Sequence, residues 1–280
     1  MIGLVHPGSM GAAVARCLVG NGHEVAWASD GRSGSTRARA ADAGLIDLGS
    51  VGRLRSECDI VLSICPPHGA HDIARSFDGY AGLFVDANGI SPESTIEVGS
   101  IVASGGAQFV DGGIIGPAPA KAGTTRLYLA GTHAPRVADL FAGSILDARV
   151  LPDAAVGAAS SLKMAYAAWT KITSALQLAL RASARLAGVE EALLDEWALS
   201  QPDLAGRSER SASVGLERGW RWSHEMLEIA RTFAADGLPA GFGEAAAEVY
   251  DRFPRPAEDA TFDDHAADLD QALRHLEPPA

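Results

Sequence analysis

IGLVHPGSMG, residues 2–11, predicts a strand that turns directly into a helix. Its first four residues are apolar, and residues 8–20 continue with small and apolar side chains at helical spacing. Gly8 and Gly11 occupy the last two glycine positions of the fingerprint G-x-G-x-x-G, which opens dinucleotide-binding domains. His6 stands where the first glycine is usual, so a tight turn without a ligand is the alternative. We expect a dinucleotide site built from His6, Pro7, Gly8, Ser9, Met10 and Gly11.

Further apolar runs of strand length follow, separated by stretches that leave room for helices. They span residues 24–28, 59–65, 83–86, 109–111 and 127–130. Strands that alternate with helices form mostly parallel sheets, in which ligands bind beyond the carboxyl ends of the strands. The sequence therefore predicts an α/β domain of the Rossmann type over residues 1–152, with its site at those strand ends.

The second half of the chain is helical in character. Residues 153–188 contain no proline and many alanines, which predicts one helix of about 30 residues. Further helices are expected over residues 190–199, 220–236, 243–252 and 263–276. These patterns predict an all-α second domain over residues 153–280, joined to the first by the long helix. We expect the apolar helical surface to form a homodimer.

Composition excludes several classes of partner. Lys and Arg total 23 against 35 Asp and Glu, so the net charge is −12, which disfavours nucleic acid and anionic membrane surfaces. The three cysteines have neither metal-site nor disulfide spacing, and we expect metal-independent chemistry. No signal peptide and no apolar run of about 18 residues is found, which predicts a cytoplasmic protein.

The segment after the second expected strand bears on the choice of coenzyme. An acidic residue here typically binds the free ribose 2′-hydroxyl of NAD, whereas arginine accommodates the 2′-phosphate of NADP. Asp30 favours NAD, while Ser29, Arg32 and Ser33 offer two hydroxyls and a guanidinium to a phosphate. We expect NADP, with NAD as the alternative. The loop after the third apolar run is expected to contact the same cofactor through Cys65, Pro66 and Pro67.

Four segments, in order along the chain, resemble the β-hydroxyacid dehydrogenase superfamily, which includes 3-hydroxyisobutyrate and 6-phosphogluconate dehydrogenases and the imine reductases. They are IGLVHPGSMG (2–11), LFVDANGISPES (83–94), FVDGGIIGPAPAKAGT (109–124) and SSLKMAYAAWTK (160–171). RWSHEM (221–226) resembles a branch whose C-terminal domain is related to that of 6-phosphogluconate dehydrogenase. The resemblance implies a Rossmann domain that binds NAD(P), a helical second domain and hydride transfer.

The resemblance also assigns catalytic roles. Lys163 falls on the family's catalytic lysine, which supplies or removes the proton that accompanies hydride transfer. The family's asparagine four residues later is Ala167 here, while Tyr166 and Thr170 share the face of Lys163 on a regular helix. Asn88 falls where the family has a small polar residue near the nicotinamide and substrate. We expect Lys163, Tyr166 and Asn88 to be catalytic.

The substrate segment departs from the family pattern. Ile115-Gly116-Pro117 stands where the family has Ser-Gly-Gly, whose serine and backbone hold a carboxylate, and Pro117 removes one N–H donor. The identity of the substrate therefore stays open. We expect it to contact Gly113, Ile115, Gly116 and Thr170.

These observations predict an NADP-dependent oxidoreductase that transfers a hydride between nicotinamide and a small carbonyl or hydroxy compound, with Lys163 as general acid and base. An imine reductase of the same superfamily is one alternative, although those enzymes usually lack this lysine. A nucleotide-binding protein without turnover is the other, and His6 and Ala167 motivate it.

Overall fold

The computed structural model of the chain describes residues 1–257, 260–262 and 264–277. Its tertiary contacts gather into two compact units, Met1–Met164 and Ala165–Ala280. The division runs within one helix, and the expected domain boundary after residue 152 stays a prediction. The first unit combines strands and helices and the second is helical, which confirms the predicted fold class.

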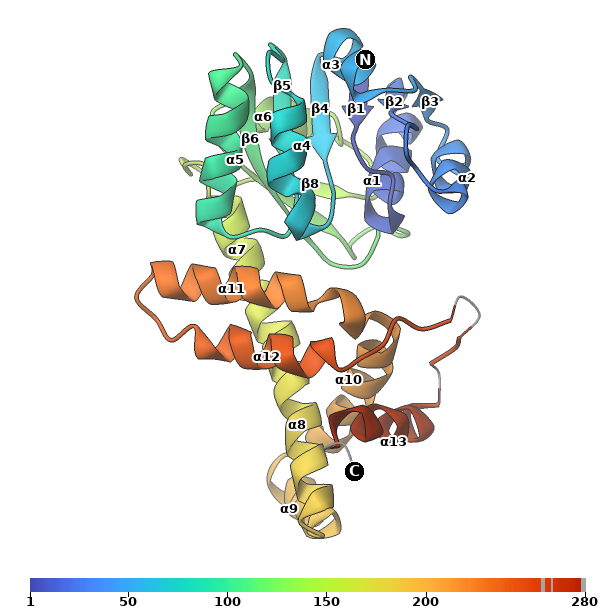
Figure 1. Cartoon of the computed structure of the whole chain (residues 1–280), viewed down its shortest axis with the longest axis vertical. Coiled ribbons are helices and arrows are strands. Elements are labelled where there is room, and N and C mark those ends of the chain that lie inside the picture. Colours follow the sequence, from blue (N-terminus) through green and yellow to red (C-terminus); the bar gives the residue numbers. More distant parts are fainter. Residues whose placement is uncertain (258–259, 263, 278–280) are drawn as a thin grey trace. The chain divides into compact units, whose positions relative to one another are not determined.

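The first unit contains a sheet of the order β3-β2-β1-β4-β5-β6-β7-β8. Strands β3, β2, β1, β4 and β5 can be followed in this order in Figure 1. All neighbours are parallel except the antiparallel pair β6 and β7. The order reverses between β1 and β4, and the crevice at such a reversal is the usual ligand site. The strands are β1 (Ile2–Leu4), β2 (Val25–Trp27), β3 (Ile46–Asp47), β4 (Ile60–Ser63), β5 (Leu83–Asp86), β6 (Gln108–Ile115), β7 (Arg126–Ala130) and β8 (Asp147–Val150).

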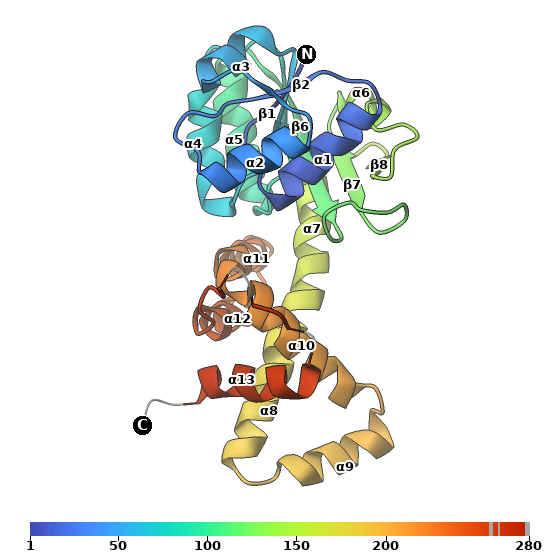
Figure 2. The same ribbon diagram turned by 90° about the vertical axis from the view of Figure 1, so that its right-hand side faces the viewer.

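Two apolar cores, one on each face of the sheet, hold the first unit together. Leu4 of β1 packs with Leu18 of α1 on one face, whereas Phe84 of β5 packs with Leu54 of α3 on the other. Helices α1 and α6 thus cover one face, and α3, α4 and α5 cover the opposite one (Figure 2). Burial on both faces explains why the central strands are continuously apolar. The helices are α1 (Ser9–Gly20), α2 (Gly34–Asp42), α3 (Val51–Glu57), α4 (Ala70–Ser76), α5 (Pro92–Ser104) and α6 (Ala134–Asp139), with a short 3₁₀ turn η1 (Pro67–Gly69).

Helix α7 leaves the first unit and continues into the second. In the second unit α8 packs against α10, α12 and α13, and α11 packs against α12. The buried guanidinium of Arg181 on α8 donates to Glu190 at 2.7 Å and to Ser208 at 2.8 Å, and so ties α9 and α10 to α8. The elements are α7 (Ala158–Ala167), a π-helical turn η2 (Ala168–Ile172), α8 (Thr173–Leu186), α9 (Glu190–Ser200), α10 (Leu204–Arg218), a 3₁₀ turn η3 (Gly219–Arg221), α11 (Ser223–Ala235), α12 (Gly241–Asp251) and α13 (His265–Leu276).

Two expectations about secondary structure were wrong. Residues 112–115 lie beyond the expected strand of residues 109–111 but extend β6, because they pair with β7 in the register Gly112↔Leu129 to Ile115↔Arg126. The long helix begins at Ala158 instead of residue 153, because Asp153 (φ 51°) and Gly157 (φ 100°) have left-handed backbone conformations. It is also interrupted by the π turn η2, which shifts the helical phase of everything that follows.

Other elements differ in smaller ways. Strands β3 and β8 and helix α10 were not expected, and the helix expected over residues 220–236 is divided into η3 and α11. The last helix begins at His265, while residue 263, its expected start, lies outside the described residues. Within the part of the chain that the structure describes, no helix is both long and apolar enough to cross a membrane.

Candidate cofactor and catalytic site

The turn between β1 and α1 leaves room for glycine alone at one position. A Cβ atom on Gly11 would lie 2.3 Å from the backbone oxygen of His6, so any other residue would separate the helix from the strand. At Gly8 the added atom would meet the ring of His6 at 3.3 Å, and here the side chain limits the space. Gly11 therefore permits the close packing of helix on strand that the motif requires. His6 occupies the place of the missing first glycine.

The N-terminus of α1 is open. Among the described residues no side chain caps it, and its first turn contains no acidic residue. The N–H groups of Ser9, Met10 and Gly11 find no acceptor in this part of the structure. Such a helix start carries a partial positive charge with free donors and is suited to a phosphate group. Pro7 is buried, so this turn offers a ligand the backbone of Gly8 to Gly11 and not the Pro7 side chain.

Arginines surround the loop that follows β2. Arg32 is half-buried and its Nη1 lies 2.9 Å from Nδ1 of His6. Arg39 donates to the backbone oxygen of Pro7 at 3.3 Å, and Arg37 donates to that of Ser29 at 2.8 Å. No acidic side chain in the described ranges forms an ion pair with Arg32. The loop thus presents a guanidinium without an acidic partner next to the open helix start.

The two serines of this loop have structural partners. Ser33 caps α2, where its hydroxyl accepts the N–H of Thr36 at 3.3 Å. Ser29 is buried. Desolvation raises the pKa of Asp47, but hydrogen bonds from the Gly49 N–H and from Ser29, together with the charge of Arg37, outweigh it and lower the pKa. Their expected contacts with a 2′-phosphate stay predictions.

Asn88 links the carboxyl ends of β4 and β5. It is 2% exposed, its Nδ2 donates to Asp86 at 2.8 Å and to Ser63 at 3.1 Å, and its Oδ1 accepts the N–H of Cys65 at 2.6 Å. Both amide hydrogens are engaged, so a contact with a ligand would fall to Oδ1. The catalytic role of Asn88 stays a prediction, and its structural role is to hold the loop of Cys65.

The loop of Cys65, Pro66 and Pro67 follows β4 at the reversal of strand order. Pro67 opens the turn η1. Burial and the neighbouring Asp86 raise the pKa of the Cys65 thiol to about 12, so the thiol stays protonated and unreactive. This segment can supply shape and stiffness to a cofactor site, but no nucleophile.

Asp111, at the middle of β6, holds the start of α7. Its Oδ2 accepts the N–H groups of Gly157 at 2.8 Å, Ala159 at 2.9 Å and Ser160 at 3.3 Å, and its Oδ1 accepts the Ser160 hydroxyl at 2.7 Å. Burial raises the pKa of Asp111, and these hydrogen bonds oppose the rise. A carboxylate at a helix N-terminus is stabilising, and here it fixes the helix that carries Lys163 to the sheet.

Gly113 continues this anchor two residues along the same face of β6. A Cβ atom on Gly113 would lie 2.5 Å from the backbone oxygen of Ala159 and 3.2 Å from Cβ of Lys163. Glycine therefore permits α7 to lie directly on the strand, and Lys163 is held there. Of the expected substrate contacts, Gly113 does lie beside Lys163, although its own surface is used by the helix.

The remaining expected substrate residues, Ile115, Gly116 and Thr170, and the expected catalytic residue Tyr166 lie in different elements. Ile115 is 4% exposed within β6. Gly116 follows at φ 117°, where a Cβ atom would lie 2.3 Å from the backbone oxygen of Thr124. Tyr166 is exposed and follows Lys163 by three residues in α7, but Thr170 lies in the π turn, so the shared face expected from regular spacing does not apply to it. The roles of these four residues stay predictions.

Asp86 is a buried carboxyl that the sequence singled out only as the end of a strand. It pairs in register with Asp111 on the neighbouring strand. Burial, with a contribution from the charge of Asp111, raises the pKa of Asp86 to about 7, while hydrogen bonds from Asn88 oppose the rise. Asp86, Asp111, Ser160 and Arg39 are the residues of this region that sequence reasoning missed as contributors.

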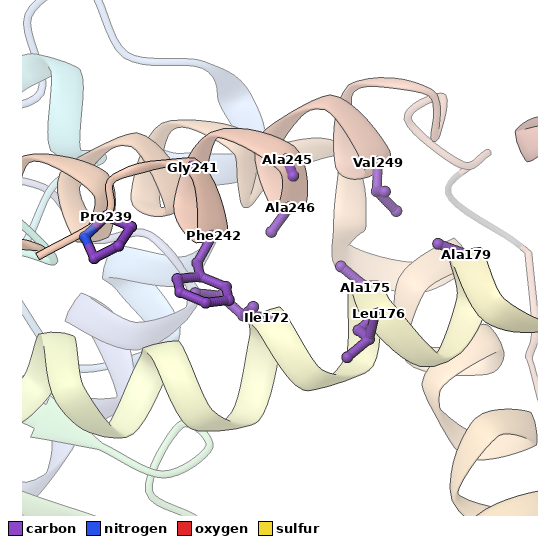
Figure 3. A pocket seen from close by; sticks show the side chains of 10 residues that line it. All are labelled: Ile172, Ala175, Leu176, Ala179, Pro239, Gly241, Phe242, Ala245, Ala246 and Val249. Carbon is purple, nitrogen blue, oxygen red and sulfur yellow. The ribbon is translucent and has the colours of Figure 1, made fainter.

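An apolar groove of about 440 Å³ lies within the second unit, between α8 and α12 (Figure 3). Phe242 from α12 and Ile172 point into it, and Leu176 lines its floor along α8. It contains none of the residues expected to bind cofactor. Among residues 1–257, 260–262 and 264–277, no cluster of three or more His, Cys, Asp or Glu side chains is placed to hold a metal ion.

Comparison with known proteins connects this geometry to a family. Residues 1–141 match the NAD binding domain of 6-phosphogluconate dehydrogenase, and residues 184–253 match a domain of unknown function, DUF1932. An uncharacterized 28.5 kDa protein of Methanothermus fervidus is 29% identical over 177 residues, which are 61% of this chain and 66% of that protein. The chain thus spans just under two thirds of the length of that relative.

Solved structures share the fold over nearly the whole chain. A conserved hypothetical protein from Sinorhizobium meliloti 1021 has a TM-score of 0.71 at 28% identity and covers 98% of this chain and 96% of its own. A conserved protein of unknown function, described as structurally similar to 3-hydroxyacid dehydrogenases, has a TM-score of 0.70 at 25% identity and covers 99% of both chains. These findings support the predicted resemblance to the β-hydroxyacid dehydrogenase superfamily. Since the match extends over half of its length, the chain belongs to the family that carries the NAD binding domain of 6-phosphogluconate dehydrogenase.

Proposed function

We propose that this protein is an NADP-dependent oxidoreductase that transfers a hydride between nicotinamide and a small carbonyl or hydroxy compound. The observation that carries the proposal is the open start of α1 beside Arg32, at the reversal of strand order in a Rossmann sheet. Free N–H donors and a guanidinium without an acidic partner are complementary to the two phosphate sites of NADP. NAD remains the alternative coenzyme, with Asp30 as its ribose contact.

The residues of the turn fit a dinucleotide. Because Gly11 packs against His6 with no space for a Cβ atom, the first turn of α1 lies close behind the strand end, and the N–H groups of Ser9 to Gly11 face a pyrophosphate at that point. Arg32 then binds the 2′-phosphate of the adenosine ribose. Its half-buried position limits the competition from water.

Lys163 supplies the proton in this proposal. The bound nicotinamide would supply or accept the hydride. When a carbonyl is reduced, the Lys163 Nζ donates a proton to the carbonyl oxygen, and in the reverse direction it accepts the hydroxyl proton. Asp111 and Gly113 fix the backbone of α7, so the position of the Lys163 Nζ is changed only by rotation about the side-chain bonds of the lysine. Holding a catalytic group in position lowers the entropic part of the reaction barrier.

A small-molecule substrate, a homodimer and a cytoplasmic location complete the proposal. The homodimer rests on the exposed apolar side chains of the second unit, among them Trp169 at 69% and Phe242 at 60% exposure. Light scattering after gel filtration measures the mass and decides between one and two copies of the 29.0 kDa chain.

The catalytic part is tested with Lys163→Met against Arg16→Met, which removes an exposed cation from α1. NADPH consumption is followed over a set of small carbonyl and imine compounds. We expect Lys163→Met to lower turnover about 10²- to 10⁴-fold with unchanged NADPH affinity, and Arg16→Met to match the wild type. Full turnover in Lys163→Met would overturn the role of the lysine. Turnover of imines alone would favour the imine reductase alternative.

A further inference from the structure

The side chain at the unusual position of the fingerprint makes a specific contact. His6 Nδ1 lies 2.9 Å from Arg32 Nη1, although the two residues are 26 positions apart. A guanidinium has only donors, so Nδ1 of His6 must accept, and the ring must be neutral with its hydrogen on Nε2. Burial lowers the pKa of His6, and the charges of Arg32 and Arg39 lower it further, which keeps the ring in this accepting form.

A second contact connects the same turn to helix α2, which follows the loop of Arg32. Arg39 of α2 donates to the backbone oxygen of Pro7 at 3.3 Å and to the hydroxyl of Thr36 at 3.0 Å. The turn of residues 6–11 is thus joined to the segment after β2 at two points: the ring of His6 contacts Arg32 of the loop, and the backbone of Pro7 contacts Arg39 of α2. A glycine at position 6 would keep the second contact and lose the first.

We infer that His6 is a positioning residue for the coenzyme: by accepting a hydrogen bond from Arg32 it fixes that guanidinium beside the open start of α1, where it selects NADP over NAD. The inference rests on the proposed function and deepens it. One Nη1 hydrogen is engaged by His6, and the remaining donors of Arg32 are directed by that bond. Because the fork of arginine is planar, fixing one nitrogen fixes the direction of the others.

The ring of His6 also fills part of the space in this turn. A histidine ring at this place occupies space beside Gly8, where an added Cβ atom would lie 3.3 Å from the ring. The ring is therefore confined between the Gly8 backbone and Arg32. The ring thereby supplies a hydrogen-bond acceptor for Arg32 that a glycine at position 6 would lack.

The experiment is a set of parallel titrations with NADPH and NADH, read by energy transfer from tryptophan to nicotinamide. It uses the wild type, His6→Ala, His6→Gln, Arg32→Ala and the double variant, with His23→Ala as a matched control at a half-buried histidine before β2. Urea unfolding of each variant without coenzyme checks that the fold is retained.

We expect His6→Ala to weaken NADPH binding about 10-fold or more, the typical value of a hydrogen bond to a charged group, and to weaken NADH binding by a clearly smaller factor. Gln retains an acceptor, so His6→Gln should recover part of the loss. In the Arg32→Ala background, His6→Ala should add nothing further, because the bond is already absent. His23→Ala should bind both coenzymes as the wild type does.

The outcomes separate the inference from the proposed function. Equal losses of NADPH and NADH affinity in His6→Ala, or additive losses in the double variant, would overturn the role of His6 while leaving the NADP assignment intact. If the wild type bound NADH more tightly, or if Arg32→Ala kept full NADPH affinity, the NADP assignment itself would fall, and the inference with it.

Discussion

Helices α1 and α7 differ in which groups meet the N–H donors at their N-termini. The start of α1 has no capping side chain and no acidic residue in its first turn among the described residues, whereas the start of α7 is filled by the carboxylate of Asp111. Both carry the partial positive charge of aligned peptide groups. The difference teaches that a helix start filled from within the chain is an anchor, while an open one keeps its N–H donors available to a ligand. The anchor holds the helix that carries Lys163, and in our proposal the open start binds phosphate.

The largest effect is expected from filling the open start. Ser9 is exposed in the first turn of α1, and Ser9→Asp places there the carboxylate that α7 already receives from Asp111. The new carboxylate would repel a pyrophosphate about 4 Å away by on the order of 4 kcal/mol, which predicts about a 10³-fold loss of NADPH affinity. Ser9→Asn is the neutral control and should lose little. Equal affinity of the aspartate and asparagine variants would contradict a phosphate at this helix.

The converse change opens the filled start. Asp111→Asn replaces an acceptor of four hydrogen bonds by a side chain whose NH₂ group faces backbone N–H donors. We expect the free energy of unfolding to fall by about 3 kcal/mol, measured in urea. Asp147→Asn, at a surface pair with Arg149, should change it by less than about 1 kcal/mol. If both variants were equally stable, Asp111 would not be the anchor described here.

The carboxyl next to the anchor predicts a pH dependence. Burial raises the pKa of Asp86 to about 7 from its ordinary value of 3.8, so the folded protein binds a proton more tightly than the unfolded chain. The contribution of Asp86 to stability is therefore complete below about pH 4 and is lost as the pH rises through 7, by up to about 1.4 kcal/mol per pH unit. Urea unfolding between pH 4 and 8 measures it. Asp86→Asn should flatten that slope, and an unchanged slope would mean that another group titrates.

The smallest effect concerns Ser33, which caps α2 beside the proposed 2′-phosphate site. Ser33→Ala should lower the free energy of unfolding by about 1 kcal/mol, as loss of an N-cap does. Ser50→Ala removes the equivalent cap of α3 and is the control. If only Ser33→Ala also weakens NADPH binding relative to NADH, the serine has both roles. If neither variant does, Ser33 is a cap alone.

Sequence reasoning succeeded where the signal is local. The turn of residues 2–11, the central strands and the change from α/β to helical structure depend on neighbouring residues and were predicted. The sequence also indicated Lys163 by resemblance and Arg32 by the pattern that distinguishes NADP from NAD, and both roles stay predictions. The match over residues 1–141 confirms the family resemblance itself.

The remaining features depend on contacts between distant segments. Gly112 and Gly113 suggest a loop, but pairing with β7 makes them strand, and glycine at 113 is needed for the close approach of α7. Asp111 meets backbone groups 46 to 49 positions away, and His6 meets Arg32 26 positions away, so neither partner can be inferred from spacing. The π turn η2 interrupts an alanine-rich helix in which no proline or glycine marks the place.

Amide hydrogen exchange with and without saturating NADPH tests the central comparison most directly, because it observes both helix starts in one experiment. The account predicts that the N–H groups of Ser9, Met10 and Gly11 exchange fast in the free protein and become protected by NADPH. It predicts that those of Gly157, Ala159 and Ser160 are protected from the outset and do not change. Fast exchange at Ser9 to Gly11 in the presence of NADPH, or fast exchange at Gly157 to Ser160 in its absence, would contradict it.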